Sequence, residues 1–304
     1  QRPATSVTIR SGMPTLGGGV RLRDDQKKAV RSAVRRERGI IHGATGSGKT
    51  EIAAAIIKKL GIPITLFITG RKKLARQTRE RFAVRLKVDL EDIGFIQGGK
   101  WEEGTTGVFV VVIDSLIAKK FARERSALYK ACELLIIDEA HHTGSSTWYR
   151  TLMFCRARYR YGLTGTPIGR SDSGDLYLRA CTGDVVAEIR AADLIESGVL
   201  AKPEIHFIGI DKPDLHDSPY SWAEVYSKGI VNNVDRNRII IDYAKQLQSA
   251  EKKTLILVRE IAHGRQLALE IPSSEFLHGS VPDDIIDIAV SQFETGEIST
   301  LIAT

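Results

Sequence analysis

The run His-Gly-Ala-Thr-Gly-Ser-Gly-Lys-Thr at 42–50 has the residue types and spacing of a phosphate-binding loop. Glycines let the backbone turn sharply and point its N–H groups inward at an anion. Lys49 places a cation where the β- and γ-phosphates of a nucleoside triphosphate would lie, and Thr50 offers a hydroxyl to Mg²⁺. A glycine-rich turn with a chance lysine is the alternative, but the strand before the run and the helix after it favour the phosphate site. The predicted phosphate-binding residues are Gly43, Ala44, Thr45, Gly46, Ser47, Gly48, Lys49 and Thr50.

Two acids follow the apolar run at 134–137, which predicts a buried strand. Asp138 supplies the hard oxygen ligand that Mg²⁺ prefers, directly or through water. Glu139 brings a second carboxylate that can polarise an attacking water. An acidic loop after a strand is the alternative, which the upstream phosphate loop disfavours. The adjacent His141 and His142 lack the spacing of a metal-binding pair.

The elements that must position these residues alternate along the chain. Continuous β-branched strands separated by helices predict an α/β fold with a parallel sheet covered on both faces. Phosphate sites in such sheets lie at the carboxyl ends of strands. The predicted strands are 65–68, 108–113, 134–137 and 160–163, and the predicted helices are 21–38, 50–60, 72–86 and one from 116 onward. After a helix at 222–248, a second series has strands at 254–258, 275–277 and 300–303 and helices at 261–270 and 283–293.

These patterns predict a division of the chain into four parts. We expect a flexible N-terminal arm at 1–20, a first lobe at 21–210, a linker and helical connection at 211–250, and the start of a second lobe at 251–304. The proline-rich run at 211–220 is predicted to be a loop.

Composition narrows the class of protein. The 304 residues contain 42% hydrophobic and 27% charged residues, as is typical of a globular protein. No apolar run approaches the roughly 18 residues that a membrane span needs, so no membrane partner is expected. Three scattered cysteines favour reduced thiols and an intracellular location, cytoplasmic or, in a eukaryote, nuclear. The net charge of +7 includes eight Lys or Arg between Arg71 and Lys87 with one acid, which suits a polyanionic partner or simply a solvated face.

Three motifs occur in the order found in superfamily 2 helicases: the Lys49-Thr50 pair, the Asp-Glu-Ala-His run from 138 to 141, and the Leu-Thr-Gly-Thr-Pro run from 163 to 167. From about residue 20 to its end, the sequence resembles the branch that holds XPB-like helicases, UvsW-like helicases and restriction-enzyme motors. The resemblance implies two RecA-like parallel-sheet lobes with an ATP-binding cleft between them. Because the family's Gln-x-x-Gly-Arg-x-x-Arg motif does not occur in these residues, the second lobe is expected to be truncated at its C-terminus.

The same resemblance implies roles for single residues. Arg23 and Gln26 match the family's Leu-Arg-x-x-Gln motif, in which the glutamine reads adenine, although a surface glutamine would fit the same helix. His141, Thr164 and Thr166 would couple the γ-phosphate site to the nucleic-acid track. The implied nucleic-acid contacts are Arg71 and Lys72, in a motif that reads Thr-Gly-Arg where the family usually has Pro-x-Arg, and also Ser115 and Thr304.

Together these observations predict an ATP- and Mg²⁺-dependent nucleic-acid helicase or translocase, with DNA favoured over RNA as its partner. Lys49, Asp138 and Glu139 are the predicted catalytic residues. Two alternatives stay open: the motor subunit of a restriction enzyme, and a signalling or assembly ATPase that binds nucleotide without translocating.

Overall fold

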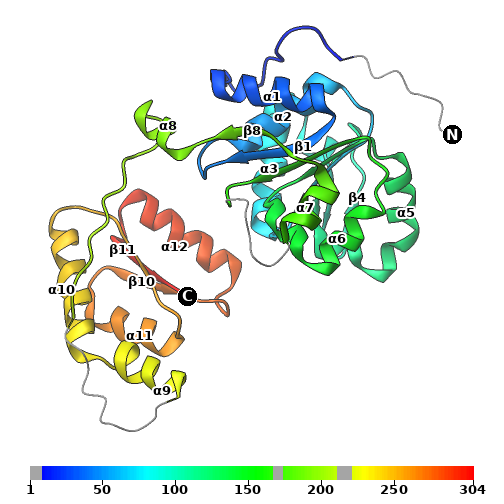
Figure 1. The fold of residues 1–304 in the computed structure, drawn as a ribbon. Coiled ribbons are helices and arrows are strands. Elements are labelled where there is room, and N and C mark those ends of the chain that lie inside the picture. Colours follow the sequence, from blue (N-terminus) through cyan, green and yellow to red (C-terminus); the bar gives the residue numbers. More distant parts are fainter. Residues whose placement is uncertain (1–8, 167–173, 211–220) are drawn as a thin grey trace. The chain divides into compact units, whose positions relative to one another are not determined.

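The computed structural model describes residues 9–166, 174–210 and 221–304 (Figure 1). The chain divides into two compact units, Gln1–Pro203 and Glu204–Thr304. The predicted α/β fold is confirmed in both, because each contains a sheet built mostly from parallel strands. None of the helices in these described ranges is long and apolar enough to cross a membrane.

The described part of the first unit contains an eight-stranded sheet in the order β4-β3-β5-β2-β6-β7-β1-β8. Neighbouring strands are parallel except for the antiparallel pair β3 and β4. The strands are β1 (Arg38–Gly43), β2 (Thr65–Thr69), β3 (Gly94–Gln97), β4 (Lys100–Glu102), β5 (Val108–Val112), β6 (Leu134–Ile137), β7 (Tyr159–Thr164) and β8 (Val185–Ile189).

Helices cover both faces of this sheet, as a buried parallel sheet requires (Figure 1). Successive strand residues point to opposite faces, so Ile41 packs with α1–α3 while Ile40 packs with α4–α7. The helices are α1 (Asp24–Arg36), α2 (Lys49–Leu60), α3 (Lys72–Leu86), α4 (Ile113–Ile117), α5 (Ala122–Ala131), α6 (Ser146–Met153), α7 (Gly174–Thr182) and α8 (Ala191–Glu196).

The β3–β4 hairpin departs from the expectation of an all-parallel sheet. Its turn places Gly98 and Gly99 at φ 58° and 79°, and two positive φ angles in succession are what a tight two-residue hairpin turn needs. The two strands have four and three residues, which is too short for alternation to be recognised in the sequence.

The flexible arm expected at 1–20 is not what the structure shows for residues 9–20. Leu16 is buried in the core of the first unit, and the Gly17 amide donates to the Arg85 carbonyl at 2.9 Å. The Lys59 ammonium donates to the Arg10 carbonyl at 2.7 Å. These contacts fasten the segment to α2 and α3, while residues 1–8 lie outside the described range.

The described part of the second unit contains a three-stranded parallel sheet in the order β10-β11-β9. The strands are β9 (Thr254–Leu257), β10 (Ser274–Leu277) and β11 (Thr300–Ala303), and the helices are α9 (Trp222–Tyr226), α10 (Val234–Ser249), α11 (Ile261–Glu270) and α12 (Asp283–Thr295). The single helix expected at 222–248 is interrupted before α10, where the Asn233 side chain caps the new helix by accepting from the Arg236 amide at 2.9 Å.

The linker expected at 211–250 also needs correction. Ile241 and Ala244 on α10 are buried against Leu267 and Ile302, so this helix is part of the core of the second unit. The boundary between the units falls after Pro203, and the loop predicted at 211–220 lies outside the described residues.

All three cysteines, Cys132, Cys155 and Cys181, are free and buried in the first unit. Burial raises the pKa of the Cys132 thiol well above its usual value, and it also raises the pKa of Cys181. The thiols of Cys132 and Cys181 are therefore protonated at neutral pH.

Arg160 on β7 is a buried cation that joins three segments of the first unit. It is 2% exposed, and its guanidinium donates to the carbonyls of Leu152, Cys155 and Cys181 at 2.9, 2.7 and 2.6 Å. Two of these carbonyls lie in the last turns of α6 and α7, where a positive charge is favourable. The side chain therefore holds both helix ends against the sheet.

Arg160→Met should lower the free energy of unfolding by about 2–4 kcal/mol, because three buried carbonyls would lose charged donors. Urea unfolding followed by circular dichroism measures this loss. The matched control is Arg158→Ala, since Arg158 is exposed and its solvent-screened ion pair with Glu37 should contribute little to stability. Equal stability of Arg160→Met and wild type would show that Arg160 does not hold the helix ends.

Candidate nucleotide and nucleic-acid site

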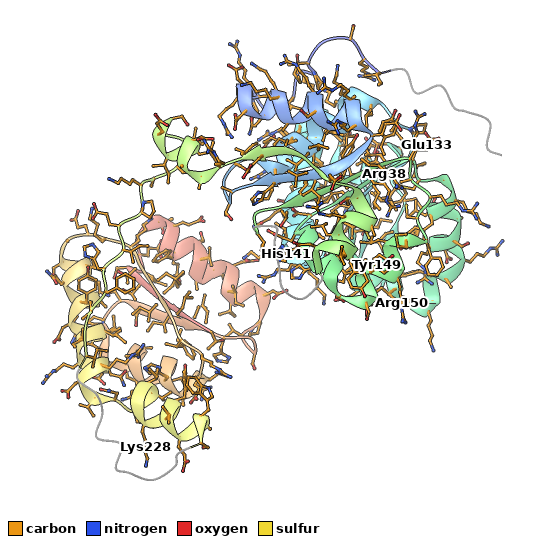
Figure 2. All side chains as sticks on the ribbon, viewed as in Figure 1. Arg38, Glu133, His141, Tyr149, Arg150 and Lys228 are labelled. Atoms are coloured by element: carbon orange, nitrogen blue, oxygen red, sulfur yellow. The ribbon has the colours of Figure 1, made fainter. Side chains whose placement is uncertain are left out.

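Five neighbouring strands of the first unit bring most of its predicted functional segments to one edge of the sheet. In spatial order β5, β2, β6, β7 and β1 lie side by side and parallel, so their carboxyl ends lie at the same edge. Along this edge come Ser115, then Arg71, then Asp138 and Glu139, then Thr164 and Thr166, and finally the phosphate loop. Figure 2 shows His141, just past the end of β6, far from Glu133, which precedes the same strand.

The phosphate loop connects β1 to α2 in the way that its sequence predicts. Gly46 and Gly48 have φ angles of 82° and 81°, which favour glycine, and α2 begins at Lys49. The Lys49 ammonium donates to the carbonyl of Gly43 at 2.9 Å and to that of Ala44 at 3.4 Å. The end of β7 comes close, because a Cβ atom on Gly165 would lie 3.3 Å from the Gly43 carbonyl oxygen and 3.4 Å from the Lys49 nitrogen.

Gln26 is fixed from both sides of its amide. Its Nε2 donates to the Ser47 carbonyl at 2.9 Å, and its Oε1 accepts from the backbone amide of Arg23 at 3.0 Å. The Arg23 guanidinium also donates to the Ser47 carbonyl, at 2.8 Å, while Asp25 grips it with two hydrogen bonds of 3.1 and 2.9 Å. A Cβ on Gly48 would lie 2.4 Å from Gln26 Nε2, so the phosphate loop needs glycine there to admit the amide.

Asp138 is buried at the end of β6, with only 8% of the residue exposed. Burial, and secondly the negative charge of Glu139, raise the pKa of Asp138 to about 6, although Lys49 opposes the shift. The carboxylate therefore carries an energetic cost at neutral pH that a nearby divalent cation would relieve.

Glu139 lies at the start of a chain of polar contacts toward β7. Its φ of 46° is unusual for a residue with a side chain, and such a conformation costs about 1 kcal/mol or more. The Glu139 carboxylate lies 3.4 Å from His141 Nδ1, and the same nitrogen lies 3.2 Å from the hydroxyls of Thr164 and Thr166. The structure thus brings together the three residues predicted to couple the phosphate site to the rest of the edge.

The predicted nucleic-acid residues fall into two groups. Arg71 and Lys72 are exposed at the start of α3, whereas Ser115 is buried and accepts from the Gly98 amide at 2.9 Å. Thr304 follows β11 in the second unit, where it is exposed and its amide donates to the Leu277 carbonyl at 3.2 Å. Their contacts with nucleic acid stay predictions.

The sequence gives little indication of two further parts of this edge. Gln97, in the amide orientation that satisfies its neighbours, donates to the Lys72 carbonyl at 3.2 Å and accepts from Arg76. The β3–β4 turn thereby joins the starts of α3 and α4. Asp25, which the sequence marks only as a helix-start acid, is the residue that orients Arg23.

The phosphate loop and the residues beside it have polar groups that suit a bound triphosphate and Mg²⁺. Ser47 Oγ is buried without a hydrogen-bond partner among the described residues, inside a loop built around left-handed glycines. Such an atom is costly unless a ligand or water satisfies it. Asp138 and Thr50 offer the hard oxygen atoms that suit Mg²⁺.

The sequence is similar to one described protein family and to several named DNA translocases and helicases. The family described as "Type III restriction enzyme, res subunit" matches residues 19–169. "DNA 3'-5' translocase XPB2" of Sulfurisphaera tokodaii is 34% identical over 164 residues, which are 54% of this chain and 35% of that protein. "DNA 3'-5' helicase XPB" of Mycobacterium tuberculosis is 22% identical over 293 residues, covering 94% of this chain and 52% of that protein. The chain thus spans about half the length of these relatives or less.

Comparison with solved structures shows the fold. Dbp5 of Saccharomyces cerevisiae, solved bound to RNA and ADP BeF3, aligns with a TM-score of 0.62 at 15% identity, covering 92% of this chain and 69% of Dbp5. The Hef helicase domain of Pyrococcus furiosus aligns with a TM-score of 0.59 at 15% identity, covering 96% of this chain and 87% of that domain. Both alignments show a shared fold, which is RecA-like.

Proposed function

We propose that the chain is a superfamily 2 helicase of the XPB-like branch, and that it is an ATP-dependent motor that translocates on or remodels DNA. The observation that carries this proposal is the order of residues along the sheet edge. Phosphate-binding residues occupy one end of that edge and the exposed Arg71 and Lys72 lie toward the other, with Glu139 between them. ATP turnover and nucleic-acid binding would thus share one row of loops.

Nucleotide binding would use both sides of the phosphate loop. The amide of Gln26 keeps one N–H and one oxygen lone pair after its bonds to Ser47 and Arg23, which suits the adenine edge. The backbone of residues 43–49 and the Lys49 ammonium would hold the phosphates. Thr50 and Asp138 would hold Mg²⁺, which when bound stabilises the charge on the phosphates.

Hydrolysis would depend on Glu139. Its side chain is 41% exposed, so the carboxylate can meet a water, and it can accept a proton as that water attacks. His141 would then transmit the state of the carboxylate to Thr164 and Thr166 through the contacts described above. Because ATP and DNA occur together inside cells, we also propose that the protein is intracellular.

The test is the ATPase rate of the full-length protein with single-stranded DNA, duplex DNA, forked DNA and RNA of matched length. We expect DNA to stimulate turnover more than RNA does. A rate that none of these polymers changes would overturn the motor and would favour a signalling or assembly ATPase.

The family match favours a second candidate, the motor subunit of a restriction enzyme. Such a subunit would couple the same ATP turnover to cleavage of DNA. Incubating the full-length protein with ATP, Mg²⁺ and a plasmid distinguishes the two. ATP-dependent breaks would support the restriction motor, whereas turnover on intact DNA would support a translocase without nuclease.

Gln26→Ala should raise the KM for ATP by about tenfold and reduce the preference for ATP over GTP, because one bidentate base contact discriminates by about 1–3 kcal/mol. Steady-state kinetics with both nucleotides measures this. Lys28→Ala is the control, since Lys28 is exposed on the same helix. An unchanged ATP preference in Gln26→Ala would show that the amide serves only the loop.

A further inference from the structure

We propose that Trp148 is a positioning residue that couples nucleic-acid binding at Arg71 to the hydrolytic carboxylate of Glu139. This inference rests on the proposed function and assigns a role to a side chain outside the motifs discussed above. Trp148 is the third residue of α6 and lies partly buried against the core beneath that helix.

On one side, the indole packs on the residue that precedes Arg71. A Cβ atom on Gly70 would lie 3.0 Å from Trp148 Cζ2 and 3.5 Å from Cη2. A side chain at position 70 would therefore displace the ring or the backbone. Because Arg71 is the N-cap of α3, the indole packs next to the start of the helix that carries Arg71 and Lys72.

On the other side, the indole reaches the hydrolytic site through two histidines. The ring centroids of Trp148 and His142 are 5.5 Å apart, and those of His142 and His141 are 4.3 Å apart. His141 is the residue that contacts Glu139, Thr164 and Thr166. Three rings in contact thus connect Gly70 with the carboxylate.

A cavity of about 540 Å³ lies between Arg71 and Glu139, so the chain of rings is the packed connection between them. Its lining includes Gly70 and Arg71 at one side and Glu139, His141 and His142 at the other. Side chains do not fill the space between Arg71 and Glu139. A packed route between them runs instead behind the lining residues Gly70 and His142, both of which contact Trp148. Closely packed side chains transmit displacement, whereas a solvent-filled space does not.

The test compares ATP hydrolysis with and without duplex DNA in wild type, Trp148→Ala and Trp148→Phe. We expect Trp148→Ala to keep the basal kcat and the KM for ATP within about twofold, and to lose about three- to tenfold of the stimulation by DNA. Trp148→Phe should recover most of the stimulation, because a ring still bridges Gly70 and His142. Gly70→Ala should reproduce the loss by displacing the indole.

Tyr149→Ala is the matched control on the same helix, since its ring packs on Tyr177 with centroids 4.8 Å apart and is not part of this chain. Normal stimulation in Trp148→Ala would overturn the inference alone, while wild type that DNA does not stimulate would overturn the proposed function as well. A parallel fall in basal turnover that Trp148→Phe does not restore would show a merely structural role and would also overturn the inference.

Fluorescence gives a readout independent of turnover. The chain has three tryptophans, so replacing Trp101 and Trp222 by phenylalanine leaves Trp148 as the single reporter. Adding a DNA oligonucleotide should change its emission, and an ATP analogue should change it again. Emission that responds to neither addition would contradict a coupling role.

Discussion

Lys49→Ala should reduce ATP hydrolysis by about 10²–10³-fold or more, which is the usual effect of removing one preorganised charge from a transition state. The Lys49 ammonium lies in the phosphate loop, where it donates to the Gly43 and Ala44 carbonyls. Alanine keeps the start of α2, because it is a good helix former, but it leaves those carbonyls facing the phosphates without a cation. Phosphate release at saturating ATP and DNA measures the effect.

Lys58→Ala is the control for this substitution. Lys58 lies near the other end of α2, where burial lowers the pKa of its ammonium, and it should affect turnover by less than about twofold. Turnover by Lys49→Ala close to that of wild type would mean that the phosphate loop is not the hydrolytic site.

Glu139→Gln should reduce the rate of ATP hydrolysis by about 10²–10⁴-fold, while ATP binding persists. Glutamine keeps the shape and can adopt the same backbone conformation, but it cannot accept the proton of the attacking water. Nucleotide affinity should stay within about threefold, because Lys49, Asp138 and Gln26 are unchanged. Fluorescent nucleotide binding and phosphate release, measured on the same preparation, separate the two effects.

Glu133→Gln is the matched control, since Glu133 precedes the amino end of β6 while Glu139 follows its carboxyl end. It should hydrolyse ATP at the wild-type rate. Loss of nucleotide binding in Glu139→Gln would show instead that the carboxylate holds the loop structure, and its contact with His141 would then be structural.

The sequence predicted the elements whose signals are strong and local. The bounds of α3 and β6 agree with those predicted, because α3 is a long helical pattern between a turn and a positively charged end and β6 is a continuous apolar run. The order of strands was not predictable in detail, yet the expectation that phosphate and acid motifs meet at one edge follows from parallel strands alone.

The features that could not be predicted from the sequence depend on contacts between residues far apart in the chain. β8 pairs with β1 at one end of the sheet, and its five residues, mostly half-buried or exposed, are too few for a clear strand pattern to be recognised in the sequence. The Gln26 amide donates to the Ser47 carbonyl, and Trp148 contacts Gly70, only after the sheet has assembled. Arg160 is similar, since nothing in a lone arginine on a strand indicates three carbonyl partners.

The buried cysteines make this protein convenient for spectroscopy. Because Cys132, Cys155 and Cys181 are buried, maleimide dyes should react with them far more slowly than with a thiol introduced at the surface. Lys28 on α1 and Lys245 on α10 are exposed positions, one in each unit, where such thiols can be placed. Energy transfer between two dyes would then follow the separation of the units during turnover, in a protein that keeps every native cysteine.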